Sequence, residues 1–220
     1  LEALSQVEED VGSLVNTLRG KLRLLLPLEF FNRLISELIC DFADRYPQIE
    51  LCCSHYSGLM PGDTDNADLI FVLHESPLPA SDWITRSLLS FPQSIYAAKQ
   101  RDLAAIRTPA DLARHPCILG ADEHQWLFRD GDQLQAVPVC GRIVLSSPEM
   151  RLEAAAHNLG LIKLPDYLCH HSQVGEQLKP VPLSHAPQAQ QLSVLYQSRS
   201  VPLKVRLFLE FFQSHLGRLS

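Results

Sequence analysis

Apolar side chains recur at alternating spacings of three and four along the first part of the chain. The recurring positions are Leu4, Val7, Val11, Leu14 and Leu18. This spacing is typical of a coiled-coil seam, so we predict a helix over residues 1–20 that pairs with a second helix. An ordinary amphipathic helix packed on its own domain has the same spacing, and that alternative stays open.

Further along, apolar runs of strand length alternate with amphipathic stretches of helix length. The predicted strands are residues 22–26, 49–56, 68–73, 178–183 and 192–197, and the predicted helices are residues 29–45 and 202–216. The strands are almost continuously apolar, which is typical of strands covered on both faces. The alternation therefore predicts an α/β fold with mostly parallel sheets.

The clearest local pattern is a strand, a helix and a second strand within residues 141–168. Ser146 and Ser147 supply hydroxyls that can cap the helix, and Pro148 suits its first position. Gly160 ends the helix before the return strand that contains Leu164. Unpaired backbone N–H groups at such a helix start suit a small polar or anionic ligand, although plain capping explains the same residues.

Three segments carry a resemblance to a known family. Residues 141–168, FADRYPQIEL at residues 42–51 and TPADLARHPCI at residues 108–118 are similar to segments of the effector-binding domain of LysR-type transcriptional regulators. The resemblance runs from Leu1 to about Leu216. It implies a two-lobed, Rossmann-like, periplasmic-binding-protein-like (type 2) effector domain, preceded by a linker helix. The implied division is a linker at residues 1–20, lobe I at residues 21–88 and 190–220, and lobe II at residues 89–189.

In such folds a small ligand lies between the lobes, beyond the carboxyl ends of strands. Residues at strand ends, crossovers and helix starts are therefore the candidates for effector binding. They are Pro27, Leu28, Glu29, Ser57, Gly58, His74, Glu75, Ser90, Phe91, Asp122, Ser146, Ser147 and Leu164.

Several of these candidates have an alternative explanation. Many LysR-type regulators place Ser or Thr ahead of the first helix, whereas this chain has Glu29, which favours a neutral or amine-bearing effector. Glu29 can instead simply stabilise the helix dipole. Ser57 and Gly58 equally suit a turn, and His74 equally suits the surface.

Composition excludes several classes of function. A net charge of −6 argues against DNA binding by this chain unaided. No G-x-S-x-G, P-loop or H-E-x-x-H motif is present, so we predict neither an enzyme nor a cofactor. No apolar run reaches 18 residues, so no membrane span is expected. Cys169, His170 and His171 lack further ligands at metal-site spacing, so no metal is predicted.

Six cysteines without CxxC spacing favour a reducing compartment, the cytoplasm, although a redox-active pair stays open. The sequence begins without Met and with an acidic segment unlike a signal peptide, so we expect a fragment of a longer protein.

The expected function is a ligand-sensing regulatory domain. The resemblance implies a small-molecule effector, a homodimer or tetramer, and operator DNA bound only through a winged helix-turn-helix that precedes Leu1. A solute-binding protein of a transport system, which has a similar two-lobed fold, is the alternative.

Overall fold

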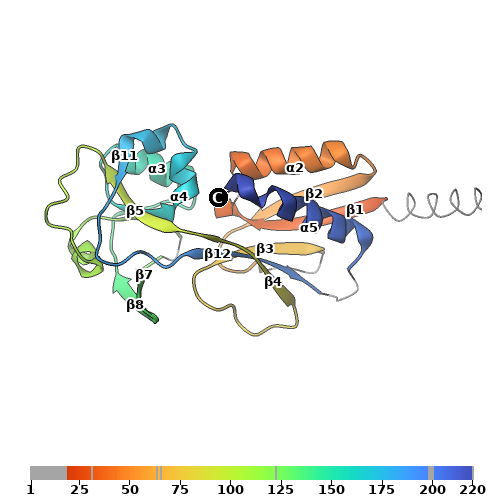
Figure 1. Ribbon diagram of the computed structural model, residues 1–220, viewed down its shortest axis with the longest axis horizontal. Helices are drawn as coiled ribbons and strands as arrows, with labels where there is room; N and C mark the ends of the chain where they lie inside the picture. The colour runs from red at the N-terminus through yellow and green to blue at the C-terminus, as the bar shows by residue number, and fades with distance from the viewer. Residues whose placement is uncertain are drawn as a thin grey trace, which may run out of the picture.

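A computed structural model describes residues 19–219, apart from residues 31, 63, 65, 122 and 198–200. The predicted coiled-coil seam and the candidate Asp122 lie outside the described residues. The described chain forms two lobes side by side, joined by extended strands that pass between them (Figure 1).

Lobe I is built on a five-stranded sheet with the order β2-β1-β3-β12-β4. Its strands are β1 (Gly20–Pro27), β2 (Ile49–Tyr56), β3 (Leu69–His74), β4 (Ile84–Phe91) and β12 (Gln190–Tyr196). The short 3-10 helix η1 (Leu28–Phe30), helix α2 (Arg33–Arg45) and helix α5 (Leu203–His215) complete it, and η4 (Leu216–Leu219) follows α5. Helices α2 and α5 lie on the same side of the sheet (Figure 1).

Lobe II comprises the elements from β5 to β11. Its three-stranded sheet has the order β10-β5-β11. The strands are β5 (Gln93–Ala98), β6 (Ile118–Leu119), β7 (Gln125–Asp130), β8 (Gln133–Pro138), β9 (Ile143–Val144), β10 (Ile162–Pro165) and β11 (Leu178–Pro180). The helices are η2 (Pro109–Arg114), α3 (Pro148–Ala156), α4 (Asp166–His170) and η3 (Val174–Gln177).

The lobe I sheet is mixed and the three-stranded lobe II sheet is antiparallel, rather than mostly parallel, which corrects one part of the predicted fold class. Strands β2 and β3 are both parallel to β1, but β12 runs antiparallel to β3 and β4. In lobe II, β5 is antiparallel to both neighbours. The physical reason is connectivity: β12 enters the sheet from lobe II, whereas β1, β2 and β3 run toward it.

Helix α2 begins at Arg33, a turn later than the expected start near residue 29. The side chain of Asn32 accepts a hydrogen bond from the backbone N–H of Ile35 at 3.2 Å, which fixes the helix start. Residues before it form η1 instead, and this turn directs the Glu29 side chain away from the helix and toward lobe II.

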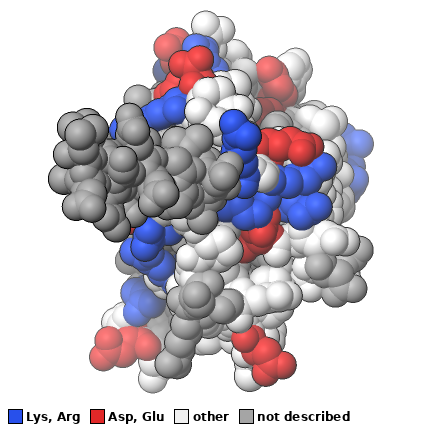
Figure 2. All heavy atoms as spheres, turned by 90° about the vertical axis from the view of Figure 1, so that its right-hand side faces the viewer, with Lys and Arg blue, Asp and Glu red and all other residues white. Residues whose placement is uncertain are grey.

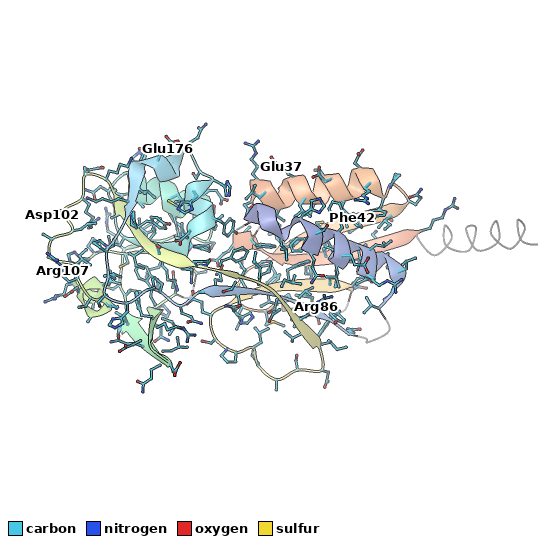
Figure 3. The ribbon with its side chains drawn as sticks, in the orientation of Figure 1. Glu37, Phe42, Arg86, Asp102, Arg107 and Glu176 are labelled. Atoms are coloured by element: carbon cyan, nitrogen blue, oxygen red, sulfur yellow. The ribbon has the colours of Figure 1, made fainter. Side chains whose placement is uncertain are left out.

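Aromatic rings fill the space between the lobe I sheet and its two helices. Phe42 of α2 is fully buried, and its ring centroid lies 4.9 Å from that of Phe208 and 5.4 Å from that of Phe211. Figure 3 shows Phe42 on the inner side of α2, facing α5. Edge-to-face contacts of this kind add to the free energy gained by burying the rings.

The surface at the far end of lobe I is polar and mixed in charge. In Figure 2, Lys and Arg side chains lie next to Asp and Glu side chains on this face. Ion pairs of this type include Lys21 with Glu50 at 2.9 Å and Lys204 with Asp68 at 3.5 Å. Among the helices of the described residues, none is long and apolar enough to cross a membrane.

Replacing Phe42 with Ala should lower the free energy of unfolding by about 3–5 kcal/mol, because it leaves a cavity among three aromatic rings. Urea unfolding followed by circular dichroism measures the loss. The matched control is Leu134→Ala on β8, where the side chain is 44% exposed, and the expected change is within about 0.5 kcal/mol. Equal losses in the two variants would contradict this assignment of the lobe I core.

Candidate functional site

A cavity of about 430 Å³ opens where the carboxyl ends of β1 and β2 meet lobe II. We call it the cleft cavity. Its lining residues come from both lobes: Pro27, Leu28, Glu29, Tyr56, Ser57, Gly58, Leu59, Leu73, Ala121 and Ser146. Six of the predicted candidates are brought together here, namely Pro27, Leu28, Glu29, Ser57, Gly58 and Ser146.

The walls of the cleft cavity combine apolar side chains with a few polar groups. Ser57 lies in lobe I and Ser146 in lobe II, so hydroxyls face the cavity from both lobes. The Tyr56 hydroxyl donates to the carbonyl of Phe71 at 2.7 Å, and burial raises the pKa of Tyr56. Glu29 is the charged residue of the described lining. An apolar pocket with few polar groups is the usual setting for a small organic ligand.

Gly58 shapes the turn at the rim of this cavity. Its φ is +92°, a backbone conformation that favours glycine. Gly58 therefore both forms the turn and lines the cleft cavity.

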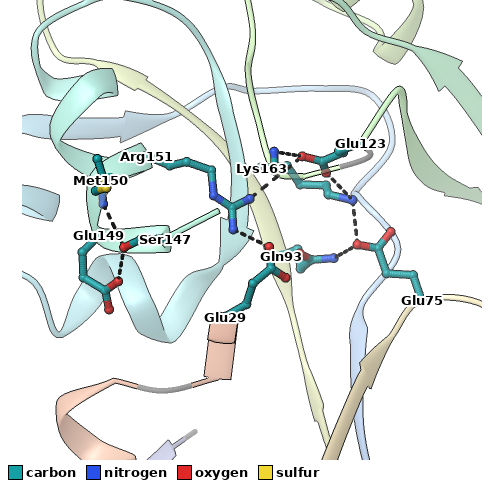
Figure 4. A network of polar contacts seen from close by, with 10 residues as sticks. Glu29, Glu75, Gln93, Glu123, Ser147, Glu149, Met150, Arg151 and Lys163 are labelled. Carbon is teal, nitrogen blue, oxygen red and sulfur yellow. Dashed lines mark hydrogen bonds and ion pairs between the residues drawn. The ribbon is translucent and has the colours of Figure 1, made fainter. Parts of the chain in front are cut away.

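The floor between the lobes is a cluster of charged side chains, which we call the ionic network. It consists of Glu29, Glu75, Glu123, Arg151 and Lys163 (Figure 4). A second, small cavity of about 70 Å³ is lined by all five residues together with Gln93, Pro148, Leu164, Pro165, Leu168 and Gln190. Glu29 lines both cavities, so the ionic network borders the cleft cavity.

Two ion pairs of the network join the lobes. Arg151 of α3 contacts Glu29 of η1, with 2.8 Å between Nη2 and Oε1. Lys163 of β10 contacts Glu75, which follows β3, with 2.6 Å between Nζ and Oε1. Glu123 of lobe II lies between the two cations, 3.9 Å from Arg151 and 3.6 Å from Lys163.

Two glutamines on the segments that connect the lobes extend the ionic network, Gln93 on β5 and Gln188 just ahead of β12. The side-chain amide of Gln93 donates to Glu75 Oε1 at 2.8 Å and to the carbonyl of Gln188 at 2.7 Å. The amide of Gln188 in turn donates to the carbonyl of Glu75 at 3.4 Å. The ionic network is therefore hydrogen-bonded to both segments of the chain that link the lobes.

The cations of the network are deeply buried. The side chains of Arg151 and Lys163 are each only 6% exposed. Arg151 Nε has no hydrogen-bond partner among the described residues. Burial raises the pKa of Glu29, Arg151 acts to lower it, and Glu123 raises it further. The network thus holds one carboxylate more than it holds cations, at a place where unbalanced charge is costly.

Ser146 and Ser147 have different surroundings. The Ser147 hydroxyl accepts a hydrogen bond from the Met150 N–H at 3.4 Å and donates to Glu149 at 2.8 Å, so it caps α3. Ser147 is not part of the described cavity lining, whereas Ser146 is. Contact of Ser147 with an effector stays a prediction.

The remaining candidates lie around the cleft cavity rather than in its described lining. His74 bridges the carbonyl of Ser76 at 2.8 Å and the hydroxyl of Ser193 at 2.9 Å. Ser90 accepts a hydrogen bond from the Gln191 amide at 2.8 Å. Phe91 is buried against the Tyr167 ring, with centroids 4.7 Å apart. Glu75 and Leu164 line the smaller cavity.

Sequence reasoning missed three members of the ionic network, Glu123, Arg151 and Lys163. Lys163 sits in the apolar strand β10, and Arg151 is buried on α3. A charged residue within an apolar segment is seldom buried without a partner. The lysine in the run Leu161 to Leu164 was therefore the available signal.

The surroundings of possible metal ligands and of two buried thiols can be described from the structure. No group of three or more His, Cys, Asp or Glu side chains gathers there in a way that could hold a metal ion. All six cysteines are free thiols. Burial raises the pKa of Cys117 to about 12 and that of Cys169 to about 11, which disfavours the reactive thiolate.

Comparison with known proteins identifies the class. Residues 16–217 match the family model of the LysR substrate binding domain, and the chain belongs to that family. It is 29% identical over 170 residues to the probable HTH-type transcriptional regulator LtrA of Klebsiella pneumoniae, covering 75% of this chain and 54% of LtrA. It is 25% identical over 216 residues to the HTH-type transcriptional regulator PtxR of Pseudomonas aeruginosa, covering 95% of this chain and 68% of PtxR.

Solved structures share the fold. The full-length Vibrio cholerae virulence activator AphB has a TM-score of 0.73 and 21% identity, covering 97% of this chain and 74% of AphB. The regulatory domain of Synechocystis CcmR in complex with 2-PG has a TM-score of 0.68 and 19% identity, covering 89% of this chain and 97% of CcmR. The predicted family and the two-lobed fold are confirmed. The chain spans about half the length of LtrA.

Lys163→Met should lower the free energy of unfolding by about 3–5 kcal/mol at neutral pH, because it removes a buried cation and leaves the partly buried carboxylates of Glu75 and Glu123 without it. The matched control is Lys21→Met, which removes a surface cation whose side chain is 39% exposed, and its expected loss is much smaller than that of Lys163→Met because solvent screens an exposed ion pair. Urea unfolding of both variants gives the comparison. Similar losses would mean that the network contributes no more than a surface ion pair.

The raised pKa of Glu29 predicts a pH-dependent stability. Because the native state binds this proton more tightly than the unfolded state, the Glu29 contribution is fully present below its usual pKa of 4.5 and is lost as pH rises through the native value. The free energy of unfolding of the wild type, relative to that of Glu29→Gln, should therefore increase as the pH falls from neutral toward 4.5. Urea unfolding of both proteins across this range tests it, and parallel pH profiles would refute it.

Proposed function

We propose that this chain is the effector-sensing regulatory domain of a transcriptional regulator, and that a small molecule binds in the cleft cavity. The observation that carries the proposal is the origin of the lining residues. Pro27, Glu29 and Ser57 come from lobe I, whereas Ala121 and Ser146 come from lobe II. A ligand in this cavity contacts both lobes at once.

Binding between the lobes gives the ligand a means of control. A ligand can shift the angle between the lobes only by the difference in its affinity for the two arrangements. The pairs Glu29–Arg151 and Glu75–Lys163 hold the lobes together in the present arrangement. A ligand that contacts Glu29 therefore acts on one of these two ion pairs directly.

Membership of the family supports a proposal for the wider assembly. We infer a cytoplasmic homodimer or tetramer in which α2 of one subunit meets α3 of a neighbour. Operator DNA is bound by a winged helix-turn-helix ahead of Leu1, since a net charge of −6 does not suit DNA binding by this domain alone. LtrA, PtxR and AphB are described as regulators, which favours this role over a solute-binding protein of a transport system.

A thermal-shift screen against small metabolites should give hits that raise the melting temperature in a dose-dependent way, because a ligand that binds only the native state stabilises it. Ser146→Ala should then weaken binding of a hit by about 1–3 kcal/mol if the hydroxyl bonds the ligand. Ser147→Ala should instead lower protein stability by about 1 kcal/mol through loss of the helix cap, with affinity unchanged.

Isothermal titration of the hit with both variants, together with their unfolding curves, separates the two roles. Loss of affinity in Ser147→Ala with full affinity in Ser146→Ala would place the ligand elsewhere. A screen without any hit, repeated on the dimeric full-length protein, would argue against effector sensing.

A further inference from the structure

The charge balance of the ionic network points to the chemical class of the effector. We propose that the effector carries one ammonium group, which binds beside Glu29 at the border between the cleft cavity and the network. This inference rests on the proposed function, because it concerns the ligand of the same cavity. It makes Glu29 the residue that determines specificity.

The first argument is the excess of negative charge. Glu29, Glu75 and Glu123 face two cations, Arg151 and Lys163, so the network carries one unbalanced carboxylate. Both cation side chains are 6% exposed, so little solvent reaches this end of the network to screen the excess. One further positive charge would make the network neutral.

The second argument is that both cations already pair with carboxylates of the protein, so an anion would add negative charge to a network that already has an excess of it, even though Arg151 Nε has no partner among the described residues. Arg151 holds Glu29 at 2.8 Å, and Lys163 holds Glu75 at 2.6 Å. Glu123 stands within 3.9 Å of both. A carboxylate or phosphate ligand would have to displace an internal carboxylate, or join three of them in one buried cluster. Like charges at such distances oppose each other strongly.

The start of α3 does not restore an anion site. The N-terminus of a helix attracts negative charge, and α3 begins next to Ser146 of the cavity lining. However, the first turn already contains Glu149, and the Ser147 hydroxyl occupies the Met150 N–H. Side chains of the protein itself, Glu149 and Ser147, therefore already interact with the positive end of this helix.

The third argument is access from the cavity. The Glu29 side chain is 40% exposed, far more than its partner Arg151, and it lines the cleft cavity itself. It holds Arg151 through Oε1, and a carboxylate can accept hydrogen bonds on both of its oxygens. An ammonium group can thus bond Glu29 without displacing Arg151. Burial raises the pKa of Glu29, and a cation bound beside it would act to lower this pKa, as Arg151 already does.

The rest of the cavity defines the remainder of the ligand. Pro27, Leu28, Leu59 and Leu73 give an apolar wall, and Ser57 and Ser146 offer hydroxyls. The effector class is therefore a small amine with an apolar body, with or without a polar group that reaches the serines.

Two sets of probes that differ in charge and little in shape test this inference. They are 2-phenylethylamine, 2-phenylethanol and phenylacetate, and n-butylamine, 1-butanol and butyrate. Binding at pH 7.5 is measured by ligand-observed NMR titration with the wild type, Glu29→Gln and Glu50→Gln. Glu50 is the matched control because it also holds a cation, Lys21, at 2.9 Å, but at the surface.

In the wild type, each amine should bind at least tenfold more tightly than its alcohol and its acid. Glu29→Gln should abolish this preference, whereas Glu50→Gln should keep it. Glu29→Asp retains the charge and should retain part of the preference, which protects the test if the Gln variant is poorly folded. Unfolding curves of all variants accompany the titrations.

A preference for the acid or the alcohol in the wild type, or an amine preference that survives in Glu29→Gln, would overturn the inference. The proposed function would still stand if the preferred compound, or a neutral or anionic metabolite from the thermal-shift screen, lost affinity in Ser146→Ala. If neither the probes nor the screened metabolites bind, the inference and the proposed function fail together.

Discussion

The ion pairs between the lobes are the interaction on which the rest of the site depends. Each lobe has its own apolar core, although Tyr167 of lobe II packs into the lobe I core, so the relative position of the lobes rests on the contacts between them and on the connecting segments. The contacts Glu29–Arg151 and Glu75–Lys163 are short, and their cations are buried. A buried cation that loses its partner carries a large penalty, so the lobes separate here only if water or a ligand replaces the lost contact.

The direction of the strands explains why the site forms where it does. Strands β1, β2 and β3 are parallel and end at lobe II, so the turns that follow them lie together. These turns contribute Glu29, Ser57 and Glu75. Lobe II contributes Ser146, just before α3, to the cleft cavity and Lys163, on β10, to the smaller cavity. The common direction of β1, β2 and β3 thus brings their hydroxyl and carboxylate groups next to the hydroxyl and cation of lobe II.

Much of this could be predicted from the sequence, because the deciding features are local. Apolar runs mark β1 and β3, and Ser147 with Pro148 marks the start of α3. The hairpin β7–β8 was missed because β8 is largely exposed and lacks an apolar pattern. The partners of Glu29 and Glu75 lie 122 and 88 residues away, and no periodicity links residues so distant in sequence. The mixed sheet was missed for the same reason, since the direction of β12 depends on a return from lobe II.

The pairing of β4 with β12, the strands that carry the chain to and from lobe II, limits how these two strands can move. β4 and β12 pair along their whole length, from Gln190 opposite Phe91 to Tyr196 opposite Ile84. Sliding one strand by a single residue would turn every side chain to the wrong face of the ribbon, so a slide of β12 along β4 is strongly disfavoured. Twisting the ribbon keeps each backbone bond and costs far less, and the bulge between Leu192 and Ser193 adds twist at that point. A twist of these two paired strands, which carry the chain to and from lobe II, is therefore a softer change than a slide of one along the other.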